Sequence, residues 1–180
     1  MKKIKRLAST FAAAAALAVS ALAAPPTASA ADGPHAEVGT HCTRWEEVSG
    51  AGGYTFTDFR TCVVVADREG RNAFVIETDR NTYWWGGAWY NTTPGYSARV
   101  SATVNMAASP YQGGPSVTAS GSWEQTSRSG RQSLGANDLI KCGARHLDVS
   151  YYQVGAYHGS DRAIDVKRSY DDFVIPCSWN

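Results

Sequence analysis

Five aromatic side chains crowd one stretch of eight residues, and they are the strongest candidates in the chain for binding a ligand. They are Tyr83, Trp84, Trp85, Trp89 and Tyr90, and they include half of the six tryptophans. Sugar rings present C–H faces that stack on indole and phenol rings, and a rigid strand would fix the spacing of those rings at little entropic cost. The stretch therefore predicts a platform for a carbohydrate. The competing interpretation is burial in the core, because aromatics paired across strands are ordinary stabilisers of sheets.

Acid–base chemistry has fewer candidates. His146 and Asp148 would share a strand face, and His158 lies near Asp161 in the sequence. A hydrolase could use such pairs, although histidines beside aspartates are common at strand ends without any catalytic role. Serine hydrolysis is not indicated, because the chain has no G-x-S-x-G motif.

Glycoside hydrolysis would need two carboxylates about 5 to 10 Å apart in a cleft. The least ordinary acids are Glu77, which follows an apolar run, and Glu124, which follows Trp123. Alternation places Glu124 on the wet side of its strand, so we interpret it as a surface charge. An ion pair with a nearby arginine explains Glu77 more simply than catalysis does.

The sequence predicts no metal site and no cofactor. Asp79-Arg80-Asn81 has oxygen ligands two residues apart, but it lacks the other ligands of a calcium loop and is equally typical of a turn. The cysteines lack the C-x₂₋₄-C spacing of structural zinc sites. No glycine-rich loop precedes a helical pattern, so a phosphate-bearing cofactor is not indicated.

The aromatic stretch is predicted to form a tight β-hairpin. Its central Gly-Gly pair suits the two-residue turns of type I′ or II′, which need positive φ. Pairing across this turn would place Trp84 opposite Trp89 and Tyr83 opposite Tyr90. One face would then carry two indoles, and the other would carry Trp85 with two phenols.

The elements around this hairpin are predicted to be antiparallel strands. Residues 96–106 alternate between apolar and polar without exception, and alternation resumes over residues 117–124. The β-branched run 62–66 predicts a central strand buried on both faces, joined in a hairpin to residues 73–76 through a turn at 67–70. Many short strands and no long helical period indicate an all-β fold, a single-domain antiparallel β-sandwich or jelly roll.

Several segments have less regular patterns. Ser127–Ser133 has no apolar residue and is predicted to be an exposed loop. Residues 137–141 are compatible with one helical turn, and the adjacent Tyr151 and Tyr152 indicate a β-bulge. Residues 161–168 fit either a strand or a short helix.

The first thirty residues have the pattern of a cleaved secretory signal peptide. Four basic residues among the first six precede the Ala/Leu-rich run Leu7–Leu22, and Ala28-Ser29-Ala30 offers a cleavage site. A membrane anchor is disfavoured because the apolar run falls short of the roughly 20 residues that a span needs. The alanine-rich leader resembles those of secreted actinobacterial proteins, a resemblance that covers the leader alone. We expect a secreted, extracellular protein of bacterial origin, with a loose lead-in at residues 31–41 and the β-domain at residues 42–180.

Four cysteines, Cys42, Cys62, Cys142 and Cys177, would follow the cleavage site. An even number in an exported chain predicts two disulfides, for which three pairings exist. We predict Cys42–Cys62 and Cys142–Cys177, because each pair would close a local loop.

Charge disfavours two classes of partner. Removing residues 1–30 takes away four cations and no carboxylate, which lowers Lys+Arg from 17 to 13 against 16 Asp+Glu, for a net charge of −3. The remaining basic residues form no cluster, so neither nucleic acid nor an anionic membrane is an expected partner.

Three functional hypotheses follow. The first is a secreted, monomeric, non-catalytic protein that recognises an extracellular glycan, a cell-wall component or another protein through Tyr83–Tyr90. The second is a protease inhibitor that inserts Ser127–Ser133, with Arg128 or Arg131 in the protease cleft. The third is a small hydrolase that uses His146, Asp148 or Glu124, the acid–base candidates considered above.

Overall fold

The computed structural model describes residues 33–108, 116–135 and 139–179. These residues belong to one compact unit, Asp32–Asn180, and the predicted signal peptide lies outside them. The described chain is almost entirely antiparallel strand, with two 3₁₀ helices, η1 (Ala51–Gly53) and η2 (Ser160–Arg162). Among the described residues, we find no helix long and apolar enough to cross a membrane.

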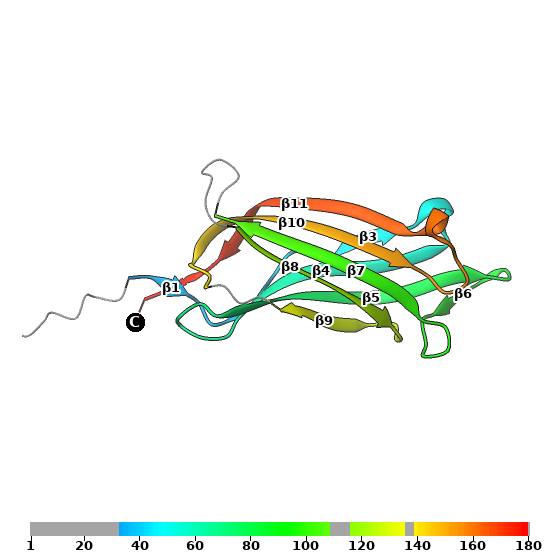
Figure 1. Ribbon diagram of the computed structural model, residues 1–180, viewed down its shortest axis with the longest axis horizontal. Helices are drawn as coiled ribbons and strands as arrows, with labels where there is room; N and C mark the ends of the chain where they lie inside the picture. The colour runs from blue at the N-terminus through cyan, green and yellow to red at the C-terminus, as the bar shows by residue number, and fades with distance from the viewer. Residues whose placement is uncertain (1–32, 109–115, 136–138, 180) are drawn as a thin grey trace, which may run out of the picture. The chain divides into compact units, whose positions relative to one another are not determined.

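One sheet has four strands in the order β11–β10–β7–β8 (Figure 1). The strands are β7 (Ala98–Ala107), β8 (Ser116–Gln125), β10 (Gly143–Val154) and β11 (Ile164–Ile175). The predicted alternation in β7 is confirmed, because every second side chain from Ala98 to Met106 is buried. β8 pairs with β7 along its whole length, so the two alternating segments belong to one sheet.

The second sheet has six strands, with β4 and β5 at its centre. The strands are β2 (Gly39–Cys42), β3 (Glu46–Ser49), β4 (Thr55–Val65), β5 (Asn72–Trp85), β6 (Ala88–Asn91) and β9 (Gly130–Gly135). The predicted hairpin of β4 and β5 is confirmed, and in its turn the Gly70 N–H donates to the Asp67 carbonyl at 3.1 Å. β4 is central because β2 and β3 pair with its other edge.

The two sheets enclose one hydrophobic core, which makes the fold the predicted β-sandwich. Strands of both sheets contribute to a single cluster of buried side chains. Within it, Phe59 of β4 stacks on Tyr151 of β10 with ring centroids 4.6 Å apart. Offset stacking of this kind adds about 0.5 to 1.5 kcal/mol to the gain from burial.

Both predicted disulfides are present, Cys42–Cys62 and Cys142–Cys177. The first joins residues that lie directly opposite each other on β2 and β4. The second joins the residue before β10 to the first residue of β12 (Cys177–Ser178). Together they link the N-terminal and C-terminal strands to the body of the sandwich.

The described part of the predicted lead-in is held in strands rather than loosely. β1 (His35–Ala36) pairs with β12, and the Ala36 side chain is buried. The Glu37 N–H donates to the Pro176 carbonyl at 2.9 Å. Backbone hydrogen bonds, to which the polar side chains of this segment gave no clue, account for the difference.

The prediction of a turn at Asp79-Arg80-Asn81 is wrong, because β5 runs through these residues. Arg80 has a φ of 52°, and the pairing of β4 with β5 is irregular beside it, between Phe56 and Asp58. A local change in backbone conformation therefore deflects the strand without ending it.

The prediction of an exposed loop at Ser127–Ser133 is also wrong in its second half. β9 begins at Gly130 and pairs with β5, while the carbonyl oxygens of Ser127 and Arg128 accept hydrogen bonds from Thr92 and Asn81. The segment is polar because an edge strand pairs through its backbone and needs few buried side chains.

Three smaller predictions are revised. The irregularity in β10 lies between Arg145 and Leu147 rather than at Tyr151 and Tyr152. Residues 161–168 contain both predicted alternatives, since the end of η2 is followed by β11. The helical turn predicted at 137–141 falls partly outside the described residues, and Leu139 within it forms a β-bridge with Arg71.

Candidate functional site

The aromatic hairpin is formed by the end of β5 and by β6, with the predicted register. Trp84 lies opposite Trp89, and Tyr83 lies opposite Tyr90. The two turn glycines have φ values of 57° and 93°, the positive values that a type I′ turn requires. The two indoles meet edge to face at 5.7 Å, and the two phenols stack at 5.8 Å.

Exposure separates these five side chains into two groups. Tyr83 is buried and Trp84 is half-buried, whereas Trp85, Trp89 and Tyr90 are 50, 49 and 47 % exposed. The core interpretation therefore applies to Tyr83 and is wrong for the three exposed rings. Trp85 and Tyr90 lie on one face of the hairpin and Trp89 on the other. Exposed aromatic residues that lie side by side mark interaction sites more often than isolated ones do.

Two further tyrosines complete one face of the hairpin. Tyr157, in the loop after β10, stacks on Trp85 with ring centroids 4.8 Å apart. Tyr96 packs against Tyr157 at 5.2 Å. Both tyrosines are about half exposed. We call Trp85, Tyr90, Tyr96 and Tyr157 the aromatic platform.

Tyr157 is held in an uncommon backbone conformation. Its φ is 63°, a value that a bulky residue adopts at a cost of order 1 to 3 kcal/mol. Such strain persists only where the surrounding structure imposes it, and it concentrates at functional sites. This residue was not predictable, because a single tyrosine in a loop has no pattern that connects it to a hairpin about 70 positions earlier in the chain.

A close approach between two loops positions the neighbouring polar side chains. A Cβ atom at Gly50, just before η1, would lie 2.1 Å from the carbonyl oxygen of Arg162 in η2. Only glycine fits there, so the two 3₁₀ helices can lie together near the tip of the hairpin (Figure 1). This contact places Asp161 and Arg162 beside the aromatic platform.

A cavity of about 460 Å³ opens between the hairpin and this loop. Its lining combines aromatic rings with polar side chains: Tyr54, Trp84, Trp85, Tyr157, His158, Asp161 and Arg162, with Gly86 and Gly159. The His158 ring donates from Nε2 to the Trp84 carbonyl at 3.0 Å, and the Arg162 guanidinium lies 3.9 Å from the centre of the Tyr54 ring. Asp161 offers carboxylate acceptors and Arg162 offers donors at the edge of an apolar surface.

His146 and Asp148 are brought together, but in an arrangement poorly suited to base catalysis. Nε2 of His146 lies 3.1 Å from Asp148, and Nδ1 lies 2.6 Å from Asp171. Both ring nitrogens therefore face carboxylates of the protein, and neither is free to accept a proton from a substrate. His158 is held at one ring nitrogen, because its Nε2 donates to the Trp84 carbonyl.

The two carboxylate candidates, Glu77 and Glu124, lie in different surroundings. Glu77 is mostly buried and pairs with Arg60 at 2.6 Å and with Arg131 at 2.8 Å, as its position after an apolar run suggested. Glu124 is exposed on β8, opposite Arg99 of β7. The exposed position of Glu124 agrees with a surface charge.

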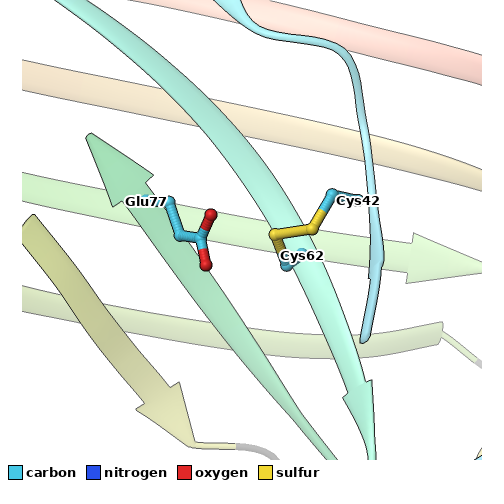
Figure 2. A group of neighbouring side chains, drawn as sticks. All are labelled: Cys42, Cys62 and Glu77. Atoms are coloured by element: carbon cyan, nitrogen blue, oxygen red, sulfur yellow. A yellow bond between two sulfur atoms is a disulfide. The ribbon is translucent and has the colours of Figure 1, made fainter. Parts of the chain in front are cut away.

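One group of potential metal ligands is present in the described residues, and its chemistry argues against a metal site. Ligand atoms of Cys42, Cys62 and Glu77 lie within 4.8 Å of one another (Figure 2). The two sulfur atoms are bonded to each other, so neither is a thiolate that could bind a metal. The Glu77 carboxylate is held by two arginines.

The suspected calcium ligands near Asp79 are likewise engaged by the protein. Asp79 accepts hydrogen bonds from the Ser129 hydroxyl and from the Arg80 N–H, both at 2.7 Å. These two bonds lower the pKa of Asp79. Both donors reach Oδ1 of Asp79, and Oδ1 of Asn81 accepts from the Thr57 hydroxyl, so these two potential calcium ligands already bind protein donors.

No family model matches the chain, and comparisons with curated proteins and with solved structures found no match either. The geometry of the site is therefore the basis for its proposed function. The feature that most clearly departs from ordinary packing is the aromatic platform with its adjoining cavity.

Proposed function

We propose that this protein is a secreted, non-catalytic binding module that recognises an extracellular or cell-wall polysaccharide through the aromatic platform. The observation that carries the proposal is the stacked pair of Trp85 and Tyr157, half exposed and held by a strained backbone at Tyr157. A sugar ring stacking on this pair would cover apolar surface that is now in contact with water.

The polar side chains of the cavity suit the hydroxyl groups of a sugar. Asp161 can accept two hydrogen bonds and Arg162 can donate several, and both lie at the edge of the rings. A few oriented polar groups around an apolar surface are typical of sites that bind small units specifically. The platform therefore supplies contact area, and Asp161 and Arg162 would supply orientation.

Export is part of this proposal. Two disulfides in a chain of this size favour an oxidising compartment. Together with the pattern of residues 1–30, they support secretion to the medium or the cell surface, where polysaccharides are the abundant ligands.

The proposal is tested by co-sedimentation of the exported protein with cellulose, chitin, xylan and cell-wall preparations. We expect at least one polymer to retain the protein, and the double variant Trp85→Ala/Tyr157→Ala to bind at least about tenfold more weakly, since two stacking contacts are lost. Trp45→Ala is the matched control, because Trp45 is 44 % exposed, lies against Arg60 and lines neither the cavity nor the platform.

Circular dichroism would establish that each variant is folded. Binding by the control but not by the double variant supports the platform. Absence of binding to every polymer, or equal binding by all three proteins, would overturn the proposal.

A further inference from the structure

A second cavity lies on the face of the hairpin that carries the indoles of Trp84 and Trp89, opposite the aromatic platform. Its volume is about 370 Å³, and it is lined by Phe56, Arg80, Thr82, Trp89, Asn91 and Arg128. Three of these residues form a row across adjacent strands, since Phe56 pairs with Thr82 and Thr82 pairs with Asn91. A ring, a hydroxyl and an amide are therefore fixed by the sheet itself, and Trp89 of β6 adds a second ring.

The indole pair connects this cavity to the first one. Trp84 lines the first cavity, Trp89 lines the second, and the two rings touch edge to face at 5.7 Å. A polymer that covers the hairpin would therefore meet an exposed aromatic ring on each face, Trp85 on one and Trp89 on the other.

Backbone strain occurs at both cavities. In the part of the chain that the structure describes, the non-glycine residues with positive φ are Tyr157, at 63°, and Arg80, at 52°. Tyr157 lines the first cavity and Arg80 lines the second. Strained residues concentrate at functional sites, and one of them lies at each cavity.

Arg80 forms a wall of the second cavity rather than a free cation. Its guanidinium pairs with Asp58 and, at 3.0 Å, with Glu47, and it lies 4.9 Å from the centre of the Phe56 ring. Its charge is already balanced by these carboxylates, which are not among the residues lining the cavity.

Unlike Arg80, Arg128 has no carboxylate of the described residues within hydrogen-bond distance. Its side chain is 59 % exposed, and its Nε lies 3.8 Å from Asp79, too far for a hydrogen bond. Asp79 instead accepts from Ser129 and from the Arg80 N–H. The donors of the Arg128 guanidinium are therefore available to a ligand in the cavity, whose lining contains no carboxylate among the described residues.

We propose that this second cavity binds a uronic acid unit of the polysaccharide, with the sugar ring on Trp89 and its carboxylate accepted by the Arg128 guanidinium. The inference rests on the proposed function and narrows the ligand to acidic polysaccharides. A guanidinium binds a carboxylate through two parallel hydrogen bonds, which gives geometric selection as well as energy. Negative charges of the chain beyond about 8 Å are screened at physiological ionic strength, and Asp79, 3.8 Å from Arg128, is a nearer carboxylate that a ligand must compete with.

The test compares matched ligands that differ only in charge. Polygalacturonate and alginate are each measured beside their methyl esters by isothermal titration calorimetry with the exported protein. We expect at least one acidic polymer to bind at least about tenfold more tightly than its ester, the difference typical of a charge-assisted bidentate contact. Arg128→Gln should remove this preference for the acidic polymer. Arg128→Lys should retain part of the preference, because lysine keeps the positive charge but cannot form the two parallel hydrogen bonds of a guanidinium.

Arg131→Gln is the control, because Arg131 is similarly exposed but pairs with Glu77 and lines neither cavity. It should keep the preference for the acidic polymer. Equal affinity for acid and ester, or equal effects of Arg128→Gln and Arg131→Gln, would overturn the inference. Polymer binding that depends on Trp85 and Tyr157 but not on charge would leave the proposed function standing, whereas no binding to any polymer would refute both.

Discussion

At the scale of single residues, Tyr157 combines three properties that rarely occur in one side chain. It adopts a positive φ, it is half exposed, and it contacts Tyr83, Trp85 and Tyr96. Its conformation costs free energy, and an exposed ring recovers little of that cost through burial. The combination is easier to understand if the ring is kept in place for a ligand than if it only stabilises the fold.

The hydroxyl of Tyr157 provides a titration test of this arrangement. A hydrogen bond with Tyr96 and, to a smaller extent, burial raise the pKa of Tyr157 from its ordinary 10.0 to about 12. Tyr96→Phe should therefore lower that pKa towards 10. The measurement is the tyrosinate absorbance titration, with the Tyr157→Phe variant subtracted to isolate this residue. Identical difference curves with and without the Tyr96 hydroxyl would contradict the hydrogen bond.

The same shift determines how stability changes with pH. Because the folded-state pKa of Tyr157 is raised, its neutral form is favoured in the folded protein, and this contribution is complete below pH 10.0. It is lost as the pH rises from there towards about 12. Urea unfolding across this range should show a smaller decline in Tyr157→Phe than in the parent protein.

At the scale of elements, Asn81 joins three parts of the sheet. Its fully buried side chain accepts from Thr57 of β4 at 2.8 Å and donates to Thr78 of β5 at 3.1 Å. It also donates to the carbonyl of Arg128, in the turn before β9, at 2.8 Å. This residue therefore fixes the backbone that carries the Arg128 guanidinium.

Replacing Asn81 tests this connection. Asn81→Ala removes three hydrogen bonds, two of them buried, and opens a small cavity, so we expect a loss of about 2 to 4 kcal/mol in the free energy of unfolding, measured in urea. Thr118→Ala is the control. It removes a hydroxyl bonded to Asn105 on the exposed face of β8 and should stay within about 0.5 kcal/mol. Similar losses of unfolding free energy in the two variants would show that the hydrogen bonds of Asn81 contribute no more to stability than the exposed one at Thr118.

The same elements show how far the sequence could be interpreted. β7 and the β4–β5 hairpin were predictable because half-buried strands alternate and buried ones are β-branched, and the Gly-Gly pair predicted the register of the aromatic hairpin. β9 was missed because its pairing with β5 uses backbone groups, which leave no mark on a polar sequence.

The candidate site was predictable only in part, for a related reason. Trp85, Trp89 and Tyr90 stand together in the sequence, so their shared hairpin could be predicted. Tyr157 and Arg128 reach the hairpin through tertiary packing, Tyr157 against Trp85 and Arg128 in the lining of the second cavity. Local patterns carry no information about such contacts between distant segments.

At the scale of the whole molecule, the two disulfides secure different parts of the sandwich. Their sequence separations are 20 and 35 residues. Loop-closure entropy gives about 3 to 4 kcal/mol for either, so loop length alone does not rank them. Burial ranks the two disulfides, because Cys62 is fully buried in β4 whereas Cys177 is exposed in β12.

We therefore expect Cys42→Ala/Cys62→Ala to lower the free energy of unfolding by about 1 to 2 kcal/mol more than Cys142→Ala/Cys177→Ala, since it also leaves a void beside the core. Denaturant midpoints of the two double variants measure this difference. Hydrogen exchange should in addition show faster opening of β1 and β12 in the second variant alone, because that bridge anchors their pairing. The reverse order of stability, with β1 protected in both variants, would mean that loop constraint outweighs packing in this sandwich.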